Sequence, residues 1–300
     1  SGTLPAENAK REIILSGGAI NSPQILMLSG IGEAEQMKAQ GIDVVADLPG
    51  VGKNLQDHLQ ARLVYKCNDP TLNVEVSSNF GHARIGLKYV LFRAGPMTMA
   101  ASLATGFLKT NEDLATPDIQ FHVQPLSAEN PGKGADPFSA YTMSVCQMRP
   151  ESKGAIRIVS SDPKVYPKIY ANYLSAETDC RTAVEGVKIA RKIAQHAPLS
   201  SKISEEFRPH ADLPMDDYDA TLDWVRSNTA SIYHPTGTCK MGSDKMAVVD
   251  ERLRVHGISG LRVADCSIMP EIVSGNTNAP AILIGEICSD LVLEDYMATA

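Results

Sequence analysis

The spacing of hydrophobic and polar residues changes along the chain, and the opening sixty residues alternate between strand and helix patterns. An apolar run at 12–15 precedes Gly17-Gly18, and an apolar segment at 24–28 follows. We expect a strand, a glycine turn and a helix that Asn21-Ser22 caps and Pro23 opens. Strands that alternate with helices are typical of an α/β domain.

The same alternation continues after this helix and returns near the end of the chain. A helix over 33–40, a strand over 42–45 and another strand over 261–265 are predicted. A closing helix should begin at Thr277 or Asn278. The apolar stripe expected to pack this helix on the core consists of Leu283, Ile287 and Leu291.

The middle of the chain has the two-residue period of half-buried strands. Over 117–124, apolar Ile119, Phe121 and Val123 alternate with polar Gln120, His122 and Gln124. Similar runs at 141–148 and 155–160 predict a largely antiparallel sheet, and helical spacing at 177–196 and 216–228 predicts two helices packed against it. This stretch is typical of an α+β domain.

No internal repeat or linker-like segment separates the α/β pattern at the two ends of the chain from the α+β pattern in its middle. We therefore expect one α/β domain, made of residues 1–60 and 233–300, that is interrupted by an inserted domain at 61–232. The fold class is a combination of α/β and α+β.

Composition narrows the possible functions. The 300 residues carry a net charge of −7 without a basic block, which argues against nucleic acid as a partner, and no apolar run has the length of a transmembrane segment. Six scattered cysteines form no C-x-x-C pair, and His234 with Cys239 is too small a set to specify a metal site. The chain has no N-glycosylation sequon, so we expect a cytoplasmic protein, with peripheral membrane association left open.

Two apparent catalytic motifs fail on inspection. Residues 47–54 end in Gly-Lys-Asn, but a phosphate-binding P-loop needs a glycine where Asp47 stands and a hydroxyl where Asn54 stands. Residues 257–261 miss the nucleophile elbow of serine hydrolases by one glycine. The sequence therefore supports neither a P-loop nucleoside triphosphatase nor a serine hydrolase.

Two loops have the composition of a binding site. In 233–242, His234 precedes a proline, which keeps its backbone extended, and small residues follow. In 274–280, an amide-rich run leads directly into the closing helix, whose first N–H groups and dipole favour negative charge.

These loops, together with residues 16–32 and 52–58, resemble the glucose-methanol-choline (GMC) oxidoreductases in their C-terminal portion. The resemblance runs from Arg11 to Leu293, and its motifs occur in family order. Within the family, the chain is similar to bacterial choline dehydrogenase-like alcohol dehydrogenases through residues 54–58, 117–125 and 263–270.

The resemblance implies FAD-dependent oxidation of an alcohol to an aldehyde or ketone, with 1–60 and 233–300 belonging to the FAD-binding domain and 61–232 binding substrate. It assigns His234 as the base and Asn276 as its partner. It also places a group of residues against FAD: Gly17, Gly18 and Ala19 toward the adenosine end, and Asp265, Cys266, Asn276 and Thr277 toward the flavin. His122, on the polar face of its strand, is a candidate on the substrate side.

Members of this family carry an N-terminal G-x-G-x-x-G turn for the FAD pyrophosphate, and this sequence has none. We therefore expect a C-terminal part that needs an N-terminal part as its partner, together with an alcohol substrate and an electron acceptor such as oxygen or a quinone. Two alternatives remain: a hydroxynitrile lyase-type, non-redox enzyme on the same scaffold, and a non-catalytic module.

Overall fold

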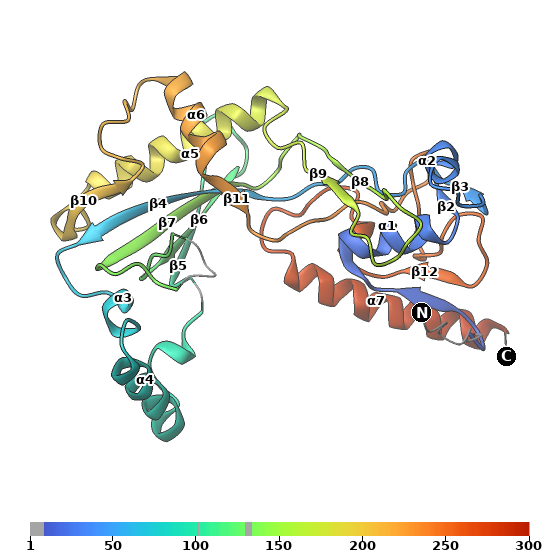
Figure 1. Ribbon diagram of the computed structural model, residues 1–300, viewed down its shortest axis with the longest axis horizontal. Coiled ribbons are helices and arrows are strands. Elements are labelled where there is room, and N and C mark those ends of the chain that lie inside the picture. The colour runs from blue at the N-terminus through green and yellow to red at the C-terminus, as the bar shows by residue number, and fades with distance from the viewer. Residues whose placement is uncertain (1–8, 101, 130–133, 300) are drawn as a thin grey trace. The chain divides into compact units, whose positions relative to one another are not determined.

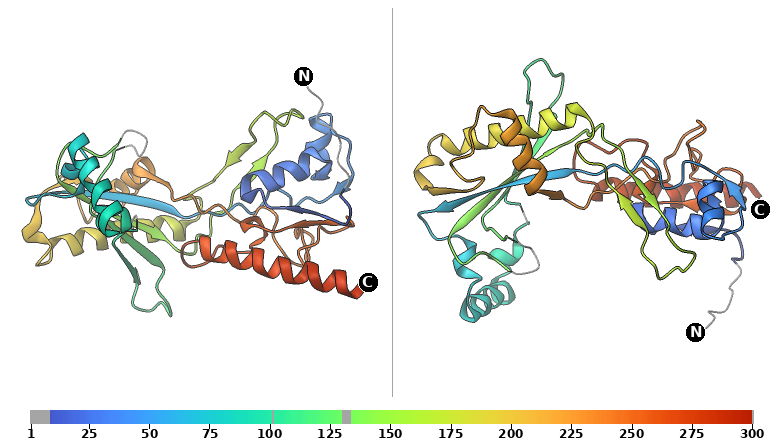
Figure 2. Two further views of the ribbon diagram at one scale, coloured as in Figure 1. Left: turned by 90° about the horizontal axis from the view of Figure 1, so that it is seen from below. Right: turned by 45° about the horizontal axis from the view of Figure 1, so that its top comes forward.

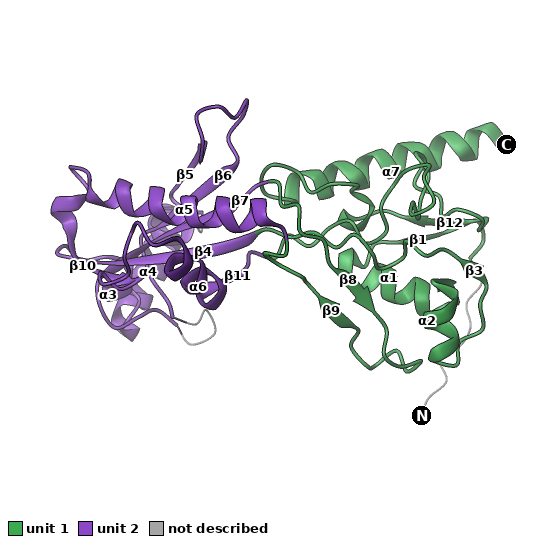
Figure 3. Cartoon of the chain, turned by 90° about the horizontal axis from the view of Figure 1, so that it is seen from above, with its two compact units in different colours: residues 1–58, 149–175, 233–300 green, residues 59–148, 176–232 purple. Residues whose placement is uncertain are grey.

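The chain forms two compact units in the computed structural model, which describes residues 9–100, 102–129 and 134–299 (Figure 3). Unit 1 combines Ser1–His58, Arg149–Ser175 and Tyr233–Ala300, and unit 2 combines Leu59–Met148 and Ala176–Ile232. Each unit is built from segments that are far apart in the sequence. No helix within the described ranges is both long and apolar enough to span a membrane.

Unit 1 has short strands with helices around a mixed apolar core (Figure 1). Two pairs of strands are parallel, β1 with β12 and β2 with β3, and one pair is antiparallel, β8 with β9. Its elements are β1 (Ile13–Leu15), α1 (Gly18–Leu28), β2 (Ile31–Gly32), α2 (Ala34–Ala39), β3 (Ala46–Asp47), β8 (Ala155–Arg157), β9 (Lys168–Tyr170), β12 (Leu261–Val263), the 3₁₀ turn η3 (Cys266–Ile268) and α7 (Asn278–Thr299).

Helix α1 begins five residues earlier than Pro23, so the prediction that Pro23 opens it is wrong. Gly17 is the N-cap and Pro23 lies inside the helix. A proline in this place leaves the carbonyl of Ala19 without its usual N–H donor. The buried hydroxyl of Thr238 donates to that carbonyl over 2.7 Å. A contact from 219 residues away therefore stabilises the irregular helix.

The segment 149–175 lies in unit 1, whereas the sequence pattern grouped it with the inserted domain. It is joined to the loop before β4 by backbone hydrogen bonds between Gly154 and Leu55, and by the N–H of Ile156, which donates to Gly52 over 2.6 Å. A Cβ on Gly52 would meet the carbonyl oxygen of Ile156 at 2.4 Å. Glycine is required there, because only a residue without a side chain permits this approach.

Helix α7 buries a different stripe from the predicted one. Leu283 and Ile287 are 59% and 47% exposed, while Cys288 is buried. The residues of α7 that pack on the core are Ile284, Cys288, Leu291 and Val292. Of the predicted stripe, only Leu291 contacts the core, because the helix is apolar on more than one side and sequence periodicity alone did not distinguish them.

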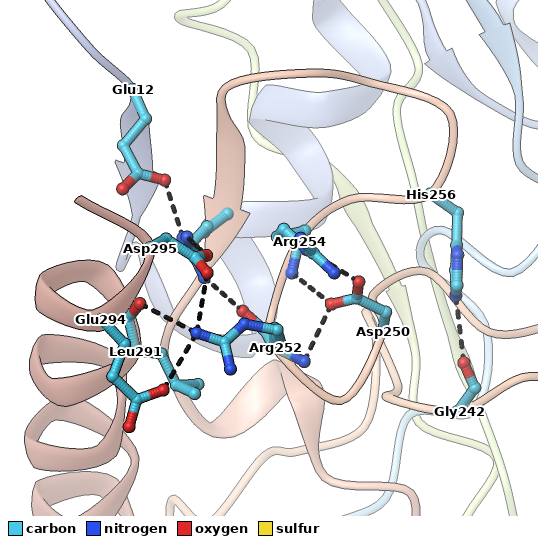
Figure 4. A network of polar contacts seen from close by, with 10 residues as sticks. Glu12, Gly242, Asp250, Arg252, Arg254, His256, Leu291, Glu294 and Asp295 are labelled. Atoms are coloured by element: carbon cyan, nitrogen blue, oxygen red, sulfur yellow. Dashed lines mark hydrogen bonds and ion pairs between the residues drawn. The ribbon is translucent and has the colours of Figure 1, made fainter. Parts of the chain in front are cut away.

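Hydrogen bonds and ion pairs connect α7 to the parallel pair β1 and β12 (Figure 4). The buried Arg262 guanidinium on β12 donates to Glu12 over 2.7 Å, to Asp295 over 2.5 Å and to the carbonyl of Arg252 over 2.6 Å. Arg252 in turn donates to Glu294 over 3.1 Å. Each arginine thus has carboxylate partners, as a charge at a buried position requires.

The strand predicted at 42–45 lies further along the chain, at Ala46–Asp47, as β3. Gly30 adopts a φ of +80° and its carbonyl accepts hydrogen bonds from the N–H groups of Val45 and Ala46. The pairing of β2 with β3 therefore begins only at Ala46.

Unit 2 is organised around an antiparallel sheet, as predicted, in the order β10-β4-β7-β6-β5, with β11 also paired to β4. Its helices α5 and α6 contact the sheet through β7 and β4 (Figure 2). The elements are β4 (Leu59–Cys67), α3 (Leu72–Glu75), α4 (Asn79–Phe92), η1 (Pro96–Thr98), β5 (Ala104–Leu108), β6 (Ile119–Gln124), β7 (Ala140–Gln147), α5 (Glu177–Gln195), η2 (Ser200–Lys202), β10 (Ile203–Arg208), α6 (Tyr218–Asn228) and β11 (Thr229–Ser231).

Candidate active site

His234 lies in the loop that re-enters unit 1, and its backbone is held from a distant part of the sequence. Its N–H donates to Oδ1 of Asp57 over 2.9 Å. The residue before it, Tyr233, has a φ of +64°. Since positive φ is unfavourable for a residue with a side chain, the turn that presents His234 needs support from neighbouring contacts.

Asp57 receives a second hydrogen bond, which keeps its carboxylate in place. The hydroxyl of Tyr173 donates to Oδ2 of Asp57 over 2.5 Å, and Asp57 is only 8% exposed. Tyr173 comes from the segment that follows β9. Sequence reasoning missed it, because nothing in the local pattern connects a tyrosine after a short strand with a histidine sixty residues later.

His58 contacts the ring of His234. The two Nδ1 atoms are 2.9 Å apart, the rings are nearly perpendicular at 82°, and His58 is completely buried. The structure shows that Asp57 anchors the His234 loop and that His58 also reaches the imidazole itself.

Asn276 lies on the opposite side of the His234 ring. Its Nδ2 is 3.4 Å from Nε2 of His234, and its side chain is exposed just before α7. The carbonyl of Thr277 accepts the N–H of Ala281 over 3.0 Å, which starts the helix. The sequence therefore predicted correctly that Asn276 precedes the helix start, and the fold brings it to His234.

Cys266 also lies at the start of α7, as His234 and Asn276 do. Its Sγ donates to the carbonyl of Thr277 over 3.9 Å. Burial, and after it the charge of Asp265, raises the pKa of the Cys266 thiol above its ordinary value. Cys266 is therefore a neutral thiol at physiological pH and is poorly suited to act as a nucleophile.

Asp265 joins the start of α1 to η3. Its Oδ2 accepts the N–H of Gly18 over 2.9 Å and the hydroxyl of Ser22 over 2.5 Å, and its Oδ1 accepts the N–H of Ser267 over 2.7 Å. Of the three residues that the resemblance assigned to the adenosine end, Gly18 is thus hydrogen-bonded to Asp265, and Gly17 donates its N–H to the Ser22 hydroxyl over 3.0 Å. A carboxylate at this helix start also complements the helix dipole.

The start of α7 suits a group that acquires negative charge. Asn278 and Ala279, the first residues of this 22-residue helix, are exposed. A Cβ added to Gly275 or to Gly18 would meet no atom within 4 Å, so both turns adjoin open space. A helix start with exposed residues, and space beside glycine turns, fit a large cofactor that becomes anionic.

His122 belongs to unit 2 and is described there by itself. It lies on β6, and its Nδ1 is 3.2 Å from Nε2 of Gln60 on β4. Gln60 and Gln120 are both buried. On the predicted polar face of β6, Gln120 is therefore buried, whereas His122 and Gln124 are half-buried.

Two family models, both described as GMC oxidoreductase, match residues 3–60 and 150–285 of this chain. The chain is 42% identical over 290 residues to an oxygen-dependent choline dehydrogenase from Cronobacter sakazakii, covering 97% of the chain and 52% of that protein. It is 40% identical over 293 residues to the protein of the same description from Brucella ovis, covering 97% and 53%.

Solved structures agree with this grouping. Formate oxidase matches with a TM-score of 0.87 and 26% identity, covering 97% of this chain and 56% of that one. Pyridoxine 4-oxidase from Mesorbium loti matches with a TM-score of 0.78 and 26% identity, covering 93% and 50%. The chain spans about half the length of the curated relatives it matches.

Proposed function

Since this chain belongs to the GMC oxidoreductases, we propose that it provides the base-bearing half of an FAD-dependent enzyme that oxidises an alcohol to an aldehyde or ketone. The observation that carries the proposal is the contact between His234 and Asn276 at the start of α7. This contact joins a group able to take a proton to an amide able to hold an oxygen, beside a helix end that favours negative charge.

FAD is the cofactor we propose. One structural relative, a formate oxidase from Aspergillus oryzae that is 25% identical, is described in terms of its FAD modification. When bound, FAD would accept the hydride that leaves the carbinol carbon. The residues that would hold it are Gly17, Gly18 and Ala19 for the adenosine end, and Asp265, Cys266, Asn276, Thr277 and the first turn of α7 for the flavin.

His234 removes the hydroxyl proton of the alcohol in this proposal. Nε2 of His234 accepts the proton, and the developing alkoxide accepts a hydrogen bond from the amide of Asn276. Histidine suits this step because its ordinary pKa is near neutral pH. Asn276 cannot take the proton itself, since an amide is not a base under these conditions.

In this proposal the two units have different roles, one in FAD binding and one in substrate binding. Unit 1 holds His234, Asn276 and the helix start, and we assign it to the FAD side. Unit 2, with the half-buried His122 on the polar face of β6, is assigned to substrate binding. An N-terminal part of the enzyme, an alcohol and an electron acceptor are the partners that this function needs. The named activity of the curated relatives makes choline a natural first substrate to test.

Anaerobic reduction of the flavin tests the proposal directly. The full-length enzyme, loaded with FAD, is mixed with choline and with a panel of primary and secondary alcohols without oxygen, and flavin absorbance is followed. We expect bleaching with at least one alcohol. His234→Gln should lower kcat/KM about 10²- to 10⁴-fold, the usual contribution of a general base.

His210→Gln is the matched control, because His210 is exposed and pairs only with Asp212 among the contacts described for it. It should leave the rate unchanged. A wild-type rate in His234→Gln would overturn the role of His234. Turnover of a cyanohydrin without any bleaching by alcohols would instead support a non-redox lyase, and a folded full-length protein without flavin or turnover would support a non-catalytic module.

A further inference from the structure

The contact between His58 and His234 limits where their protons can lie. Their Nδ1 atoms are 2.9 Å apart, which is a hydrogen-bond distance. A neutral imidazole carries one N–H and one bare nitrogen, so one Nδ1 must donate and the other must accept. Two Nδ1–H groups could not face each other at this distance. The pair therefore shares a single proton between the two Nδ1 atoms.

The direction of this hydrogen bond decides whether His234 can be a base. If His58 donates, Nδ1 of His234 is bare, its proton is on Nε2, and Nε2 cannot accept a proton from substrate. If His234 donates, its Nδ1 carries the proton and Nε2 is unprotonated and able to accept one. Only the second arrangement serves the reaction.

Asn276 favours the second arrangement from the other side of the ring. Its Nδ2, a donor, faces Nε2 of His234 at 3.4 Å, so Nε2 is the acceptor of that contact. An Nε2 that accepts from Asn276 leaves the ring proton on Nδ1. Nδ1 then donates to His58, and the two contacts agree.

We propose that His58 is a positioning residue that holds His234 as its Nδ1–H tautomer, so that the Nε2 lone pair points to the reacting hydroxyl. This rests on the proposed role of His234 as base. His58 accepts the Nδ1–H bond both before proton transfer and after it, when His234 is an imidazolium. It thereby takes the place that a carboxylate occupies in a serine hydrolase triad, without adding a charge.

The sequence around His58 explains how the ring is kept in place. His58 follows Asp57, whose carboxylate holds the backbone of His234, and precedes the first residue of β4. Two consecutive side chains thus hold the same histidine, one through its N–H and one through its ring. His58 is also completely buried, so the packing around it restricts the orientation of its ring.

Nitrogen NMR of histidine side chains reads the tautomer without any need for turnover. The protein is labelled with [¹⁵N]histidine, and the signals of His234 are identified by their loss in His234→Gln. We expect a protonated Nδ1 and an unprotonated Nε2 in the wild type. His58→Asn and His58→Leu form a matched pair of similar size, and only asparagine offers an acceptor oxygen near the position of Nδ1.

The tautomer should persist in His58→Asn and should shift toward Nε2–H in His58→Leu. In the flavin-loaded full-length enzyme, the leucine variant should lose at least tenfold in kcat with little change in KM, and the asparagine variant should recover most of it. Circular dichroism and thermal unfolding of both variants establish that they are folded.

An Nε2–H tautomer in the wild-type protein, or the same tautomer in His58→Leu as in the wild type, would overturn the inference. Failure of the proposed function has a different signature. In that case no alcohol reduces the flavin, yet the tautomer of His234 still follows the residue at position 58.

Discussion

Oδ1 of Asp57 lies 2.9 Å from the backbone nitrogen of His234, and Oδ2 of the same carboxylate lies 2.5 Å from the hydroxyl of Tyr173. Asp57→Ala removes both contacts and leaves the partly buried N–H of His234 and hydroxyl of Tyr173 without this acceptor. We expect a loss of about 1–3 kcal/mol in the free energy of unfolding, measured by urea denaturation. Tyr173→Phe should cost less, since it spares the contact to His234, and an equal loss in both variants would contradict the account.

Asn276→Ala tests the oxygen-holding role at the other side of His234. Removal of a hydrogen-bond donor to a developing negative charge commonly lowers kcat about 10²- to 10³-fold, and we expect a loss of this order with little effect on stability. Stopped-flow reduction of the flavin in the full-length enzyme measures it. Asn278→Ala, at the first residue of α7, is the comparison, and an equal loss in this variant would show that Asn276 acts only through the helix start.

Asp265→Ala should be among the more destabilising substitutions in unit 1, because it removes the acceptor of Gly18, Ser22 and Ser267 at once. We expect about 2–4 kcal/mol from hydrogen bonds to a charged group. Ser22→Ala removes one of these contacts, together with the hydrogen bond that the N–H of Gly17 donates to the Ser22 hydroxyl over 3.0 Å, and should still cost less than Asp265→Ala. Chemical denaturation measures the free energy of unfolding of both variants. Similar losses in the two variants would mean that Asp265 does not stabilise unit 1 through all three contacts.

Two helical glycines of unit 2 should respond to alanine in opposite directions. A Cβ on Gly186 in α5 would lie 2.9 Å from Cγ2 of Val145 on β7, whereas a Cβ on Gly86 in α4 would meet nothing within 4 Å. Gly186→Ala should therefore lose about 1–3 kcal/mol through overpacking. Gly86→Ala should gain about 0.5–1 kcal/mol through helix propensity. Thermal unfolding measures both, and stabilisation in both variants would mean that α5 is not in tight contact with the sheet.

The network around α7 should weaken in acid. The hydrogen bond from Arg262, first among several causes, holds the pKa of Asp295 below its ordinary value of 3.8. Because this pKa is lower in the folded state than in the unfolded state, the contribution of Asp295 to stability is present above pH 3.8 and is lost as the pH falls through the folded-state pKa.

Asp295→Asn should therefore reduce the loss of stability between neutral pH and about pH 3. Urea midpoints measured across this range for the wild type and the variant make the comparison. Glu286→Gln, at an exposed position of the same helix, is the control and should retain the wild-type pH dependence. Parallel curves for wild type and Asp295→Asn would show that the ion pair with Arg262 does not contribute.

Local patterns were sufficient to predict the main elements. The alternation over 117–124 became β6, the run at 141–148 became β7, and the helical spacing at 177–196 and 216–228 became α5 and α6. Each of these depends on residues that are neighbours in the sequence and share one face of a regular element, which is why periodicity reveals them. The motifs around His234 and Asn276 were also visible, because each lies within one short segment.

By itself, then, the sequence determined the family, the α/β and α+β parts of the fold, and the segments that carry the candidate catalytic residues. Only the tertiary structure decided that 149–175 packs in unit 1 and that Thr238 satisfies the carbonyl left open by Pro23. It also decided that His58 and Asp57 contact His234, with Tyr173 holding the Asp57 carboxylate. These relationships depend on hydrogen bonds between residues up to 219 positions apart. No local period encodes such a contact, because it forms only when the core brings the separate segments together.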